Sequence, residues 1–271
     1  MTITATTTGL AATGLTVGYG GEPILNNLDF TLPTGQFTAV IGPNGCGKST
    51  LVKSLSRVLP TAPGMVSLDG TTLHKYRPRI LAQRIALLPQ HPIIPDGVTV
   101  RNLVARGRYP YHGPLRQWSP DDPQAIHEAL EATGLTEFAD FAVAELSGGQ
   151  RQRAWLAMVL AQQTDYVLLD EPTSFLDIAH QIDVLRLCQQ ITASGRTVLA
   201  VLHDLNQAAR YADEIVVMHH GAIVATGAPS EVLTTDLITE VFGMASMIGA
   251  DPWSGTPMVV PIDSARPSAS S

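Results

Sequence analysis

The clearest pattern along the chain is a series of short apolar runs separated by turns rich in glycine and proline. Residues 37–41, 85–88, 166–169 and 197–202 are almost continuously apolar, which is typical of strands buried inside a sheet. Several of these runs lead into segments with helical character. The pattern therefore predicts an α/β fold with a mostly parallel sheet.

Other parts of the chain show different patterns. Residues 10–17 and 24–32 are bounded by Gly- and Pro-containing turns, so they are predicted to be antiparallel strands of an N-terminal subdomain. Residues 97–160 become helical in character, with caps and stops in the usual places, and we expect an inserted helical subdomain there. Near the C-terminus, helices are predicted within 229–242, and a last edge strand at 257–261.

The composition is that of an ordinary globular protein. The 271 residues are 45% hydrophobic and 15% charged, with a net charge of −7, which argues against a nucleic-acid scaffold. No apolar run is long enough to span a bilayer, and no signal peptide opens the chain. We expect a single domain at residues 9–262, with disordered ends at 1–8 and 264–271.

The most informative stretch follows the first buried run, at residues 42–50. It fits the pattern of a glycine, four free positions and then Gly-Lys-Ser/Thr, in which backbone N–H groups cradle phosphates at the start of a helix. Lys48 can reach the β- and γ-phosphate oxygens, and the Ser49 hydroxyl can bind Mg²⁺. The predicted nucleotide-binding residues are Gly42, Pro43, Asn44, Gly45, Cys46, Gly47, Lys48, Ser49 and Thr50.

Polar residues end three later buried runs. Asp170 and Glu171 are adjacent, so their side chains point to opposite sides and must differ in role. Asp170 can hold Mg²⁺ from outside its direct ligands or through water, and Glu171 can face the water that attacks the γ-phosphate. Gln90 and His203 follow the other two runs and are expected at the same sheet edge, where His203 is a candidate contact of the γ-phosphate.

Three further segments carry candidate chemistry. Ser147, followed three residues later by Gln150, predicts a capping box, and Gly148 and Gly149 leave backbone N–H groups free for a second anion. Tyr19, in a glycine-rich turn, is a candidate platform for a purine base. Residues 106–113 are basic and aromatic; a solvated loop and a partner-binding surface are both consistent with them.

Taken together, these motifs resemble those of an ATP-binding-cassette (ABC) ATPase subunit, in the order typical of that family. The likeness spans residues 9–245 and includes the phosphate loop, Gln90, the signature at 146–150, Asp170 and Glu171, the loop at 174–177, and His203. It implies a P-loop NTPase core, ATP and Mg²⁺ as ligands, and Ser49, Gln90 and Asp170 at the metal. Phe175 is a departure, because many members have alanine there.

The resemblance also implies how such a chain works. Two copies would close head to tail, burying ATP between the phosphate loop of one and Ser147, Gly148, Gly149 and Gln150 of the other. Lys48, Gln90, Glu171 and His203 would then be the catalytic residues. Tyr19 would stack on adenine.

Residues 106–110, 173–181, 203–208 and 254–258 resemble the corresponding segments of the iron-chelate importer branch. This resemblance implies ferric-siderophore uptake. Importers for haem or cobalamin, and soluble ABC proteins that serve no transporter, remain as alternatives. The partners implied are a second copy, an integral membrane permease at the cytoplasmic face of the inner membrane and, indirectly, a substrate-binding protein; nucleic acid is not among them. Candidate residues for the permease groove are Arg101, Arg106, Arg108, Tyr109 and Tyr111, beside Gln90.

Overall fold

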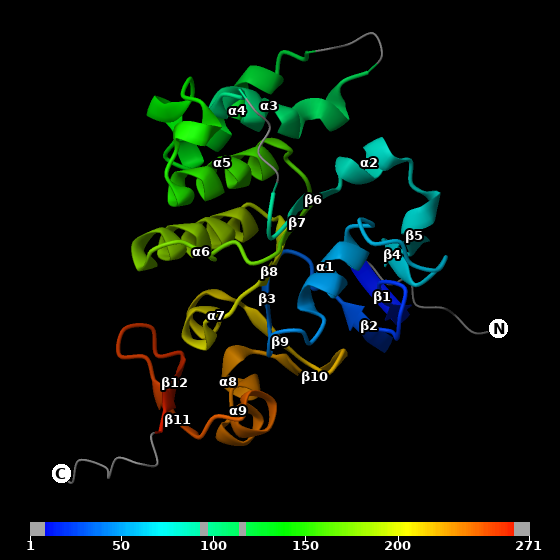
Figure 1. Ribbon diagram of the computed structural model, residues 1–271, viewed down its shortest axis with the longest axis vertical. Coiled ribbons are helices and arrows are strands. Elements are labelled where there is room, and N and C mark those ends of the chain that lie inside the picture. The colour runs from blue at the N-terminus through cyan, green and yellow to red at the C-terminus, as the bar shows by residue number, and fades with distance from the viewer. Residues whose placement is uncertain (1–8, 93–96, 114–117, 263–271) are drawn as a thin grey trace.

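The computed structural model describes residues 9–92, 97–113 and 118–262. The chain begins with antiparallel strands, passes through a group of helices at one end of the molecule, and returns across a central sheet to a C-terminal hairpin (Figure 1). The segments 1–8 and 264–271, predicted to be disordered, lie outside the described residues. Among the residues described, no helix combines the length and hydrophobicity that crossing a bilayer requires.

The centre of the molecule is a six-stranded sheet with the strand order β10-β9-β3-β8-β7-β6. Neighbouring strands pair in parallel except at β10, which runs antiparallel to β9. Every residue of β3, β7 and β8 is buried, as the apolar runs predict. The strands are β3 (Phe37–Ile41), β6 (Ile85–Leu88), β7 (Tyr166–Leu169), β8 (Thr197–Val201), β9 (Glu214–His219) and β10 (Ala222–Gly227).

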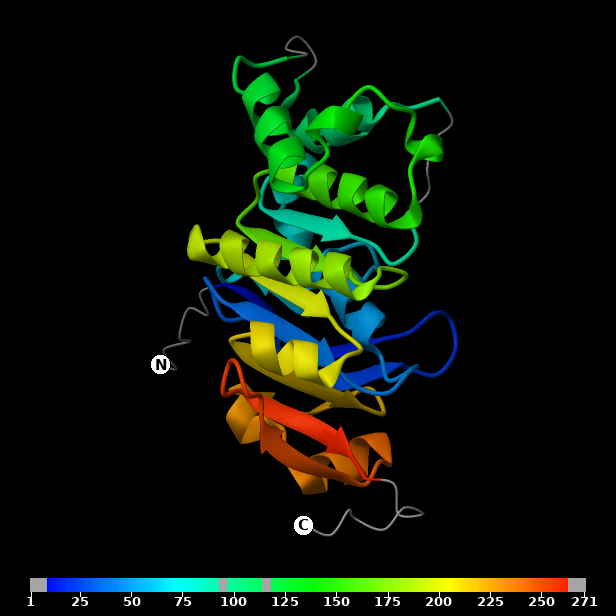
Figure 2. The same ribbon diagram turned by 90° about the vertical axis from the view of Figure 1, so that its left-hand side faces the viewer.

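The two faces of this sheet are covered by different elements, because side chains alternate along each strand. Val40 of β3 belongs to the hydrophobic cluster that contains Leu51 and Leu55 of α1 (Lys48–Leu55). Ala39 and Ile41 belong to the cluster that contains residues of α6 (Ile178–Ala193) and α7 (Leu205–Tyr211). These last two helices lie over the same face of the sheet (Figure 2).

A second, four-stranded sheet with the order β2-β1-β4-β5 is antiparallel throughout, which confirms the predicted N-terminal subdomain type. Its inner residues, such as Leu15 and Phe30, share the hydrophobic cluster of α1. The sheet therefore supports the helix that follows the phosphate loop. Its strands are β1 (Leu10–Val17), β2 (Leu25–Thr31), β4 (Val66–Leu68) and β5 (Thr71–Thr72).

The helices of the middle segment gather at one end of the molecule (Figure 1). They are α3 (Val100–Ala105), α4 (Asp122–Ala132) and α5 (Gly148–Ala161), with the shorter α2 (Pro78–Ala82) nearby in sequence. Thr99 caps α3 by accepting a hydrogen bond from the Asn102 N–H at 3.3 Å, as its position predicts. Buried residues of all three helices share one hydrophobic cluster with α6 and the central sheet.

Arg108 is buried, so its assignment to a partner-binding surface is wrong. Its side chain is 4% exposed, and its Nε donates to the Asp122 Oδ1 at 2.8 Å, while the Asp122 side chain is fully buried. Asp122 Oδ2 also accepts from the Ser119 N–H at 2.7 Å and lies 3.0 Å from His112 Nε2. Arg108 stacks on the Tyr111 ring at 4.0 Å. Arg108 and its aromatic neighbour thus form an internal brace. Residue type alone does not distinguish such a brace from a surface patch.

The C-terminal strand is present as predicted, but it does not extend the central sheet. β12 (Pro257–Pro261) pairs with β11 (Ser246–Ala250) in a separate two-stranded sheet, after α8 (Pro229–Val232) and α9 (Thr235–Phe242). Its other edge meets the Asn206 side chain of α7. Asn206 Nδ2 donates to the Val259 carbonyl at 3.2 Å, and its Oδ1 accepts from the Val259 N–H at 2.7 Å.

We predict that Asp122→Asn lowers the free energy of unfolding by about 2–4 kcal/mol at neutral pH, because it leaves the buried Arg108 without its counter-charge. Burial alone would raise the pKa of Asp122, but the Ser119 N–H, Arg108 and His112 outweigh it and lower the pKa from 3.8 to about 2. A lowered folded-state pKa stabilises above the unfolded-state pKa, and this stability is lost as pH falls toward 2.

Urea unfolding of both proteins across this pH range measures the effect, with exposed Asp121→Asn as the matched control. The difference between the wild type and Asp122→Asn should be constant above about pH 5 and should shrink as the solution is acidified. A variant as stable as Asp121→Asn at pH 7 would contradict the buried brace.

Candidate nucleotide-binding site

The glycine-rich loop lies where β3 ends and α1 begins, at the edge of the sheet formed by the carboxyl ends of its parallel strands. Gly42 has φ 150°, and a Cβ there would lie 2.1 Å from the Met218 carbonyl oxygen. Gly47 has φ 107°, and a Cβ there would lie 2.6 Å from Leu25 Cδ2. Only glycine fits both positions, so the sequence requirement of this loop is steric. Gly47 caps α1 without a side-chain bond, which leaves the first N–H groups of the helix available to an anion.

Lys48 folds back across this loop. Its side chain is nearly buried, and its Nζ donates to the carbonyl oxygens of Gly42 at 2.8 Å and of Pro43 at 2.9 Å. These bonds hold a positive charge at the mouth of the loop, although they use donors that a phosphate would also attract. The arrangement suits a group with at least two negative charges, because such a group can compete with two neutral carbonyls for the Lys48 ammonium.

Ser49 and Asp170 meet beside the loop. Ser49 Oγ donates to Asp170 Oδ1 at 2.8 Å, while Asp170 Oδ2 is buried with no hydrogen-bond partner in the described structure. Burial raises the pKa of Asp170 despite the Ser49 hydrogen bond, which shows how costly this carboxylate is without a counter-charge. A hydroxyl and a carboxylate with a free oxygen are the ligand types that Mg²⁺ prefers, so these residues fit the predicted cation.

Glu171 is held by three side chains. His203 Nε2 lies 2.9 Å from its Oε1, the Ser174 hydroxyl donates to its Oε2 at 3.0 Å, and Gln90 also bonds to the carboxylate. Burial alone would raise the pKa of Glu171, but these bonds, that of His203 first, outweigh it and lower the pKa. Glu171 is thus ionised and tightly solvated by the protein in this arrangement.

Half of the predicted site residues line a single cavity of about 410 Å³, which falls within the usual size range of ligand pockets. The phosphate loop, the end of β6 and the loops after β7 and β8 all contribute to it. Its lining residues are Ile24, Asn44, Gly45, Gly47, Lys48, Ser49, Thr50, Gln90, Glu171 and His203.

The structure does not bring the signature segment or Tyr19 into the lining of this cavity. Ser147 and Gln150 do form the predicted capping box: Ser147 Oγ accepts from the Gln150 N–H at 3.2 Å, and Gln150 Oε1 accepts from the Ser147 N–H at 2.9 Å. Gly148, however, borders a different hollow, together with Phe175. Tyr19 is 59% exposed in its turn. One copy of the chain therefore holds two separate halves of the predicted machinery.

The structure also gives a place in the site to residues for which the sequence reasoning had assigned no role. Ser174 lies three residues after Glu171 in the chain, and its hydroxyl reaches back to the Glu171 carboxylate. The sequence could have revealed this spacing. Ile24 lines the cavity from the turn before β2, and nothing in its apolar identity predicts this position.

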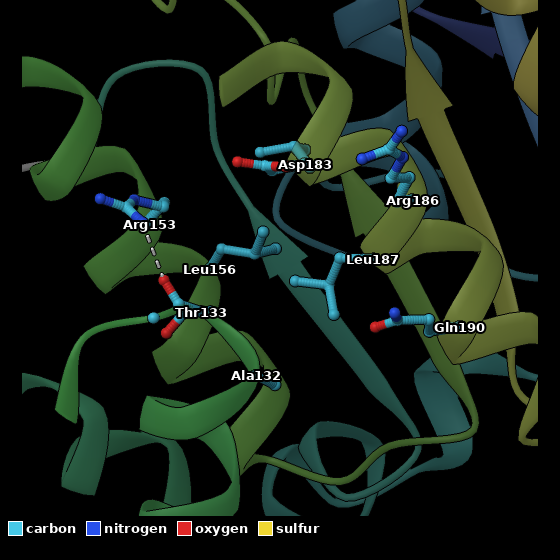
Figure 3. Close-up of a pocket in the computed structure, with 10 residues that line it drawn as sticks. Ala132, Thr133, Arg153, Leu156, Asp183, Arg186, Leu187 and Gln190 are labelled. Atoms are coloured by element: carbon cyan, nitrogen blue, oxygen red, sulfur yellow. Dashed lines mark hydrogen bonds between the residues drawn. The ribbon is translucent and has the colours of Figure 1, made fainter. Parts of the chain in front are cut away.

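A separate hollow lies between α4, α5 and α6 (Figure 3). Leu156 and Leu187 form its apolar floor, and Arg153 at its rim donates to the Thr133 carbonyl oxygen at 3.3 Å. None of its described lining residues belongs to the predicted nucleotide motifs. It is therefore not the site at which the chemistry of Glu171 takes place.

Comparisons with known proteins show the family to which the chain belongs. A family model described as ABC transporter matches residues 25–174, more than half of the chain. The chain is 51% identical over 255 residues to the ferric enterobactin transport ATP-binding protein FepC of Escherichia coli (strain K12), covering 94% of each protein. It is 47% identical over 261 residues to the achromobactin transport ATP-binding protein CbrD of Dickeya dadantii (strain 3937), covering 96% of this chain and 97% of that one.

Solved structures share the fold. An inward-facing transporter described as being of the metal-chelate ABC type has a TM-score of 0.80 at 28% identity, covering 96% of this chain and 99% of its own. The dimeric structure of MJ0796, a bacterial ABC transporter cassette, has a TM-score of 0.72 at 26% identity, covering 81% and 98%.

We predict that Cys46 in the phosphate loop reacts slowly with a maleimide in the folded protein, and that Cys188 reacts only after unfolding. Cys46 is 5% exposed, and burial raises its pKa; Cys188 is fully buried, and burial raises its pKa to about 12. Since the thiolate is the reactive form, both effects slow the reaction.

Labelling rates of Cys46→Ser and Cys188→Ser, in buffer and in urea, separate the two thiols. The Cys188→Ser protein, which retains Cys46, should label more slowly in buffer than in urea, by at least about tenfold. Equal rates in both solvents would mean that the loop does not bury its thiol in solution.

Proposed function

Because this chain belongs to the ATP-binding subunits of ABC transporters, we propose that it hydrolyses ATP at the site above and thereby powers the import of a ferric siderophore. The observation that carries the proposal is the cavity where Lys48, Ser49, Gln90, Glu171 and His203 meet. Cations, amides and a carboxylate converging on a glycine-rich loop are what phosphoryl transfer requires.

In this proposal the loop residues bind the phosphates. The backbone N–H groups of residues 44–50 surround the β-phosphate, and Lys48 leaves the Gly42 and Pro43 carbonyls to pair with the β- and γ-oxygens. Tyr19, exposed in its turn, stacks on the adenine. Ser49, Gln90 and Asp170 hold Mg²⁺, which when bound neutralises charge on the transferred group. The free Oδ2 of Asp170 supports that assignment.

Glu171 is the proposed general base, and His203 controls it. While His203 bonds to Glu171, the lowered pKa makes the carboxylate a weak proton acceptor. When His203 turns to the γ-phosphate instead, Glu171 loses its strongest hydrogen-bond donor, and its pKa rises toward that of an effective base. ATP binding would thus activate the carboxylate that hydrolyses it.

Two copies of the chain are proposed to complete each site. The helix start at residues 147–150 presents free backbone N–H groups, yet it borders a hollow other than the phosphate-loop cavity. A head-to-tail dimer would place this helix start against the γ-phosphate of the other copy. The dimeric arrangement of the MJ0796 cassette supports the proposal.

The output of closure is proposed to pass to a separate integral membrane permease, with this chain at the cytoplasmic face of the inner membrane. Gln90, His91, Arg151, Trp155 and Phe175 line a hollow beside the site, and exposed Tyr109 follows α3 in the chain. A permease helix would enter there, and a substrate-binding protein would contact only the permease. The net charge of −7 disfavours nucleic acid as a partner.

A ferric siderophore is preferred over haem as the transported substrate. The named siderophore relatives are 47–51% identical to the chain, whereas the hemin import ATP-binding protein HmuV of Rhodococcus jostii (strain RHA1) is 41% identical. Haem import remains the second candidate. The cargo would never touch this chain, so its residues cannot select between the two.

We predict that Glu171→Gln in the host abolishes uptake of a radiolabelled ferric siderophore but leaves haem uptake unchanged. The purified variant should bind ATP as tightly as the wild type and hydrolyse it at least about a hundredfold more slowly, because the amide cannot accept the proton. Exposed Glu240→Gln, which makes the same chemical change on α9, is the control.

Each result has its own meaning in this experiment. Near-normal hydrolysis by Glu171→Gln would contradict its role as the base. Loss of haem uptake with siderophore uptake intact would transfer the proposal to the second candidate. If both survive while hydrolysis is lost, the chain serves neither importer.

The proposed shared sites predict complementation between two inactive variants. Lys48→Ala damages the phosphate loop, and Ser147→Arg blocks the signature, so each homodimer should have two defective sites. In a mixed pair, one site carries both lesions and the other carries none. An equal mixture should therefore recover up to about a quarter of wild-type ATP hydrolysis, as half of the pairs are mixed.

Steady-state hydrolysis across mixing ratios measures this recovery, and it should peak at equal amounts. Fluorescence energy transfer between differently labelled copies of the two variants measures separately how readily their subunits exchange. Absence of recovery despite demonstrated exchange would mean that each copy contains its own complete site.

A further inference from the structure

The turn that carries Glu171 has an unfavourable backbone. Glu171 has φ 56° and Phe175 has φ 63°, and neither is glycine. The left-handed region costs an ordinary side chain about 1–2 kcal/mol per residue, so such a turn persists only where surrounding contacts hold it. Its internal hydrogen bonds, from the Ser174 N–H to the Glu171 carbonyl and from the Leu176 N–H to the Thr173 carbonyl, measure 3.2 and 3.4 Å. They are long, so the main restraint comes from elsewhere.

Amide side chains from the neighbouring helices provide that restraint. Gln181 on α6 donates its Nε2 to the Leu176 carbonyl at 3.0 Å and to the Thr173 carbonyl at 3.4 Å. Gln152 on α5 donates to the Pro172 carbonyl at 3.1 Å. The turn is therefore fastened from both sides.

Gln181 is in turn fixed by Gln207 on α7, whose Nε2 donates to the Gln181 Oε1 at 2.6 Å. The direction of these bonds is determined throughout. The turn offers only carbonyl acceptors, so Gln181 must present its NH₂ group there and its oxygen to Gln207, which must then be the donor. Both glutamines are half-buried, which reduces competition from water.

Gln207 lies close to His203 along the chain. The Asp204 side chain, next to His203, accepts hydrogen bonds from the Asn206 N–H at 2.8 Å and the Gln207 N–H at 2.9 Å, and so fixes the start of α7. A bonded series thus runs from the loop of His203, through Gln207 and Gln181, to the turn of Glu171. The side chains of Glu171 and His203 are also in direct contact, so the series of bonds closes into a ring.

We propose that Gln181 and Gln207 are positioning residues that form a one-directional hydrogen-bond relay between the loop of His203 and the turn of Glu171. The relay keeps the two loops in register after His203 leaves Glu171 for the phosphate, when their direct contact is lost. Neither glutamine lines the phosphate-loop cavity, and both act through the orientation of the base. This inference rests on the proposed hydrolytic function.

Three substitutions of Gln207 test the direction of the bonds. Gln207→Glu removes the donor and adds an acceptor, so Gln181 must turn its NH₂ toward residue 207 and its oxygen toward the turn carbonyls. Gln207→Lys retains a donor. Gln207→Met retains the length of the side chain without polarity. We expect kcat for ATP hydrolysis to fall about tenfold in Gln207→Glu and by a smaller factor in Gln207→Met. In Gln207→Lys it should stay above about half of the wild-type value. KM should change less than about twofold in all three variants.

The ranking separates a relay from simple packing. If the side chain merely fills space between α6 and α7, Met replaces it best and Lys worst, which would overturn the proposal. Gln189→Glu is the matched control, because Gln189 donates to the Tyr211 carbonyl at 3.1 Å and joins the same two helices at their far ends. It should change kcat less than about twofold. Thermal unfolding of every variant identifies any loss that arises from misfolding.

A double substitution gives the second measurement. Once Gln181→Met has broken the relay, adding Gln207→Glu should cause little further loss of kcat, whereas independent effects would multiply. Multiplying effects would overturn the relay. Glu171→Gln assayed alongside keeps the two proposals distinct: if it is inactive while Gln207→Glu is fully active, the relay fails and the hydrolytic function stands.

Discussion

The parallel pairing of buried strands determines where the reactive groups of this protein lie. Ile41, Val201, Leu169 and Leu88 end or nearly end strands whose partners are fixed residue by residue. Because both faces of these strands are buried, a shift in register would expose apolar side chains to water. The hydrophobic core thus sets the spacing between the phosphate loop and the polar residues that follow the other strands, although none of the core residues has any chemistry of its own.

The charged side chains at that edge are only partly compensated by their partners in the protein. Asp170 is buried with one unpaired oxygen, Lys48 spends its donors on carbonyl groups, and Glu171 is bonded to a histidine. A bound polyanion with its cation would give these groups stronger partners than the protein groups that they contact here. Ligand binding can therefore exchange one set of bonds for another with little movement of the backbone.

The sequence was informative wherever function depends on local geometry. The loop at residues 42–50 and the capping box of Ser147 and Gln150 are short-range patterns, and each forms its element as expected. Arg108 misled because burial depends on Asp122, which is distant in the chain and ordinary in type. Nothing in the sequence indicated that Gln181 and Gln207 contact each other, because an amide contact depends on what the side chain meets in three dimensions. The partner of β12 likewise depended on tertiary contacts.

The Asn206 side chain protects one edge of the C-terminal hairpin from pairing with other molecules. Its amide imitates a peptide group, occupying the N–H and carbonyl of Val259 on the outer edge of β12. An unprotected strand edge recruits strands from other chains, which is a common beginning of aggregation. One side chain here closes that edge at its middle, so the hairpin can remain a two-stranded appendage without becoming a template for lateral growth.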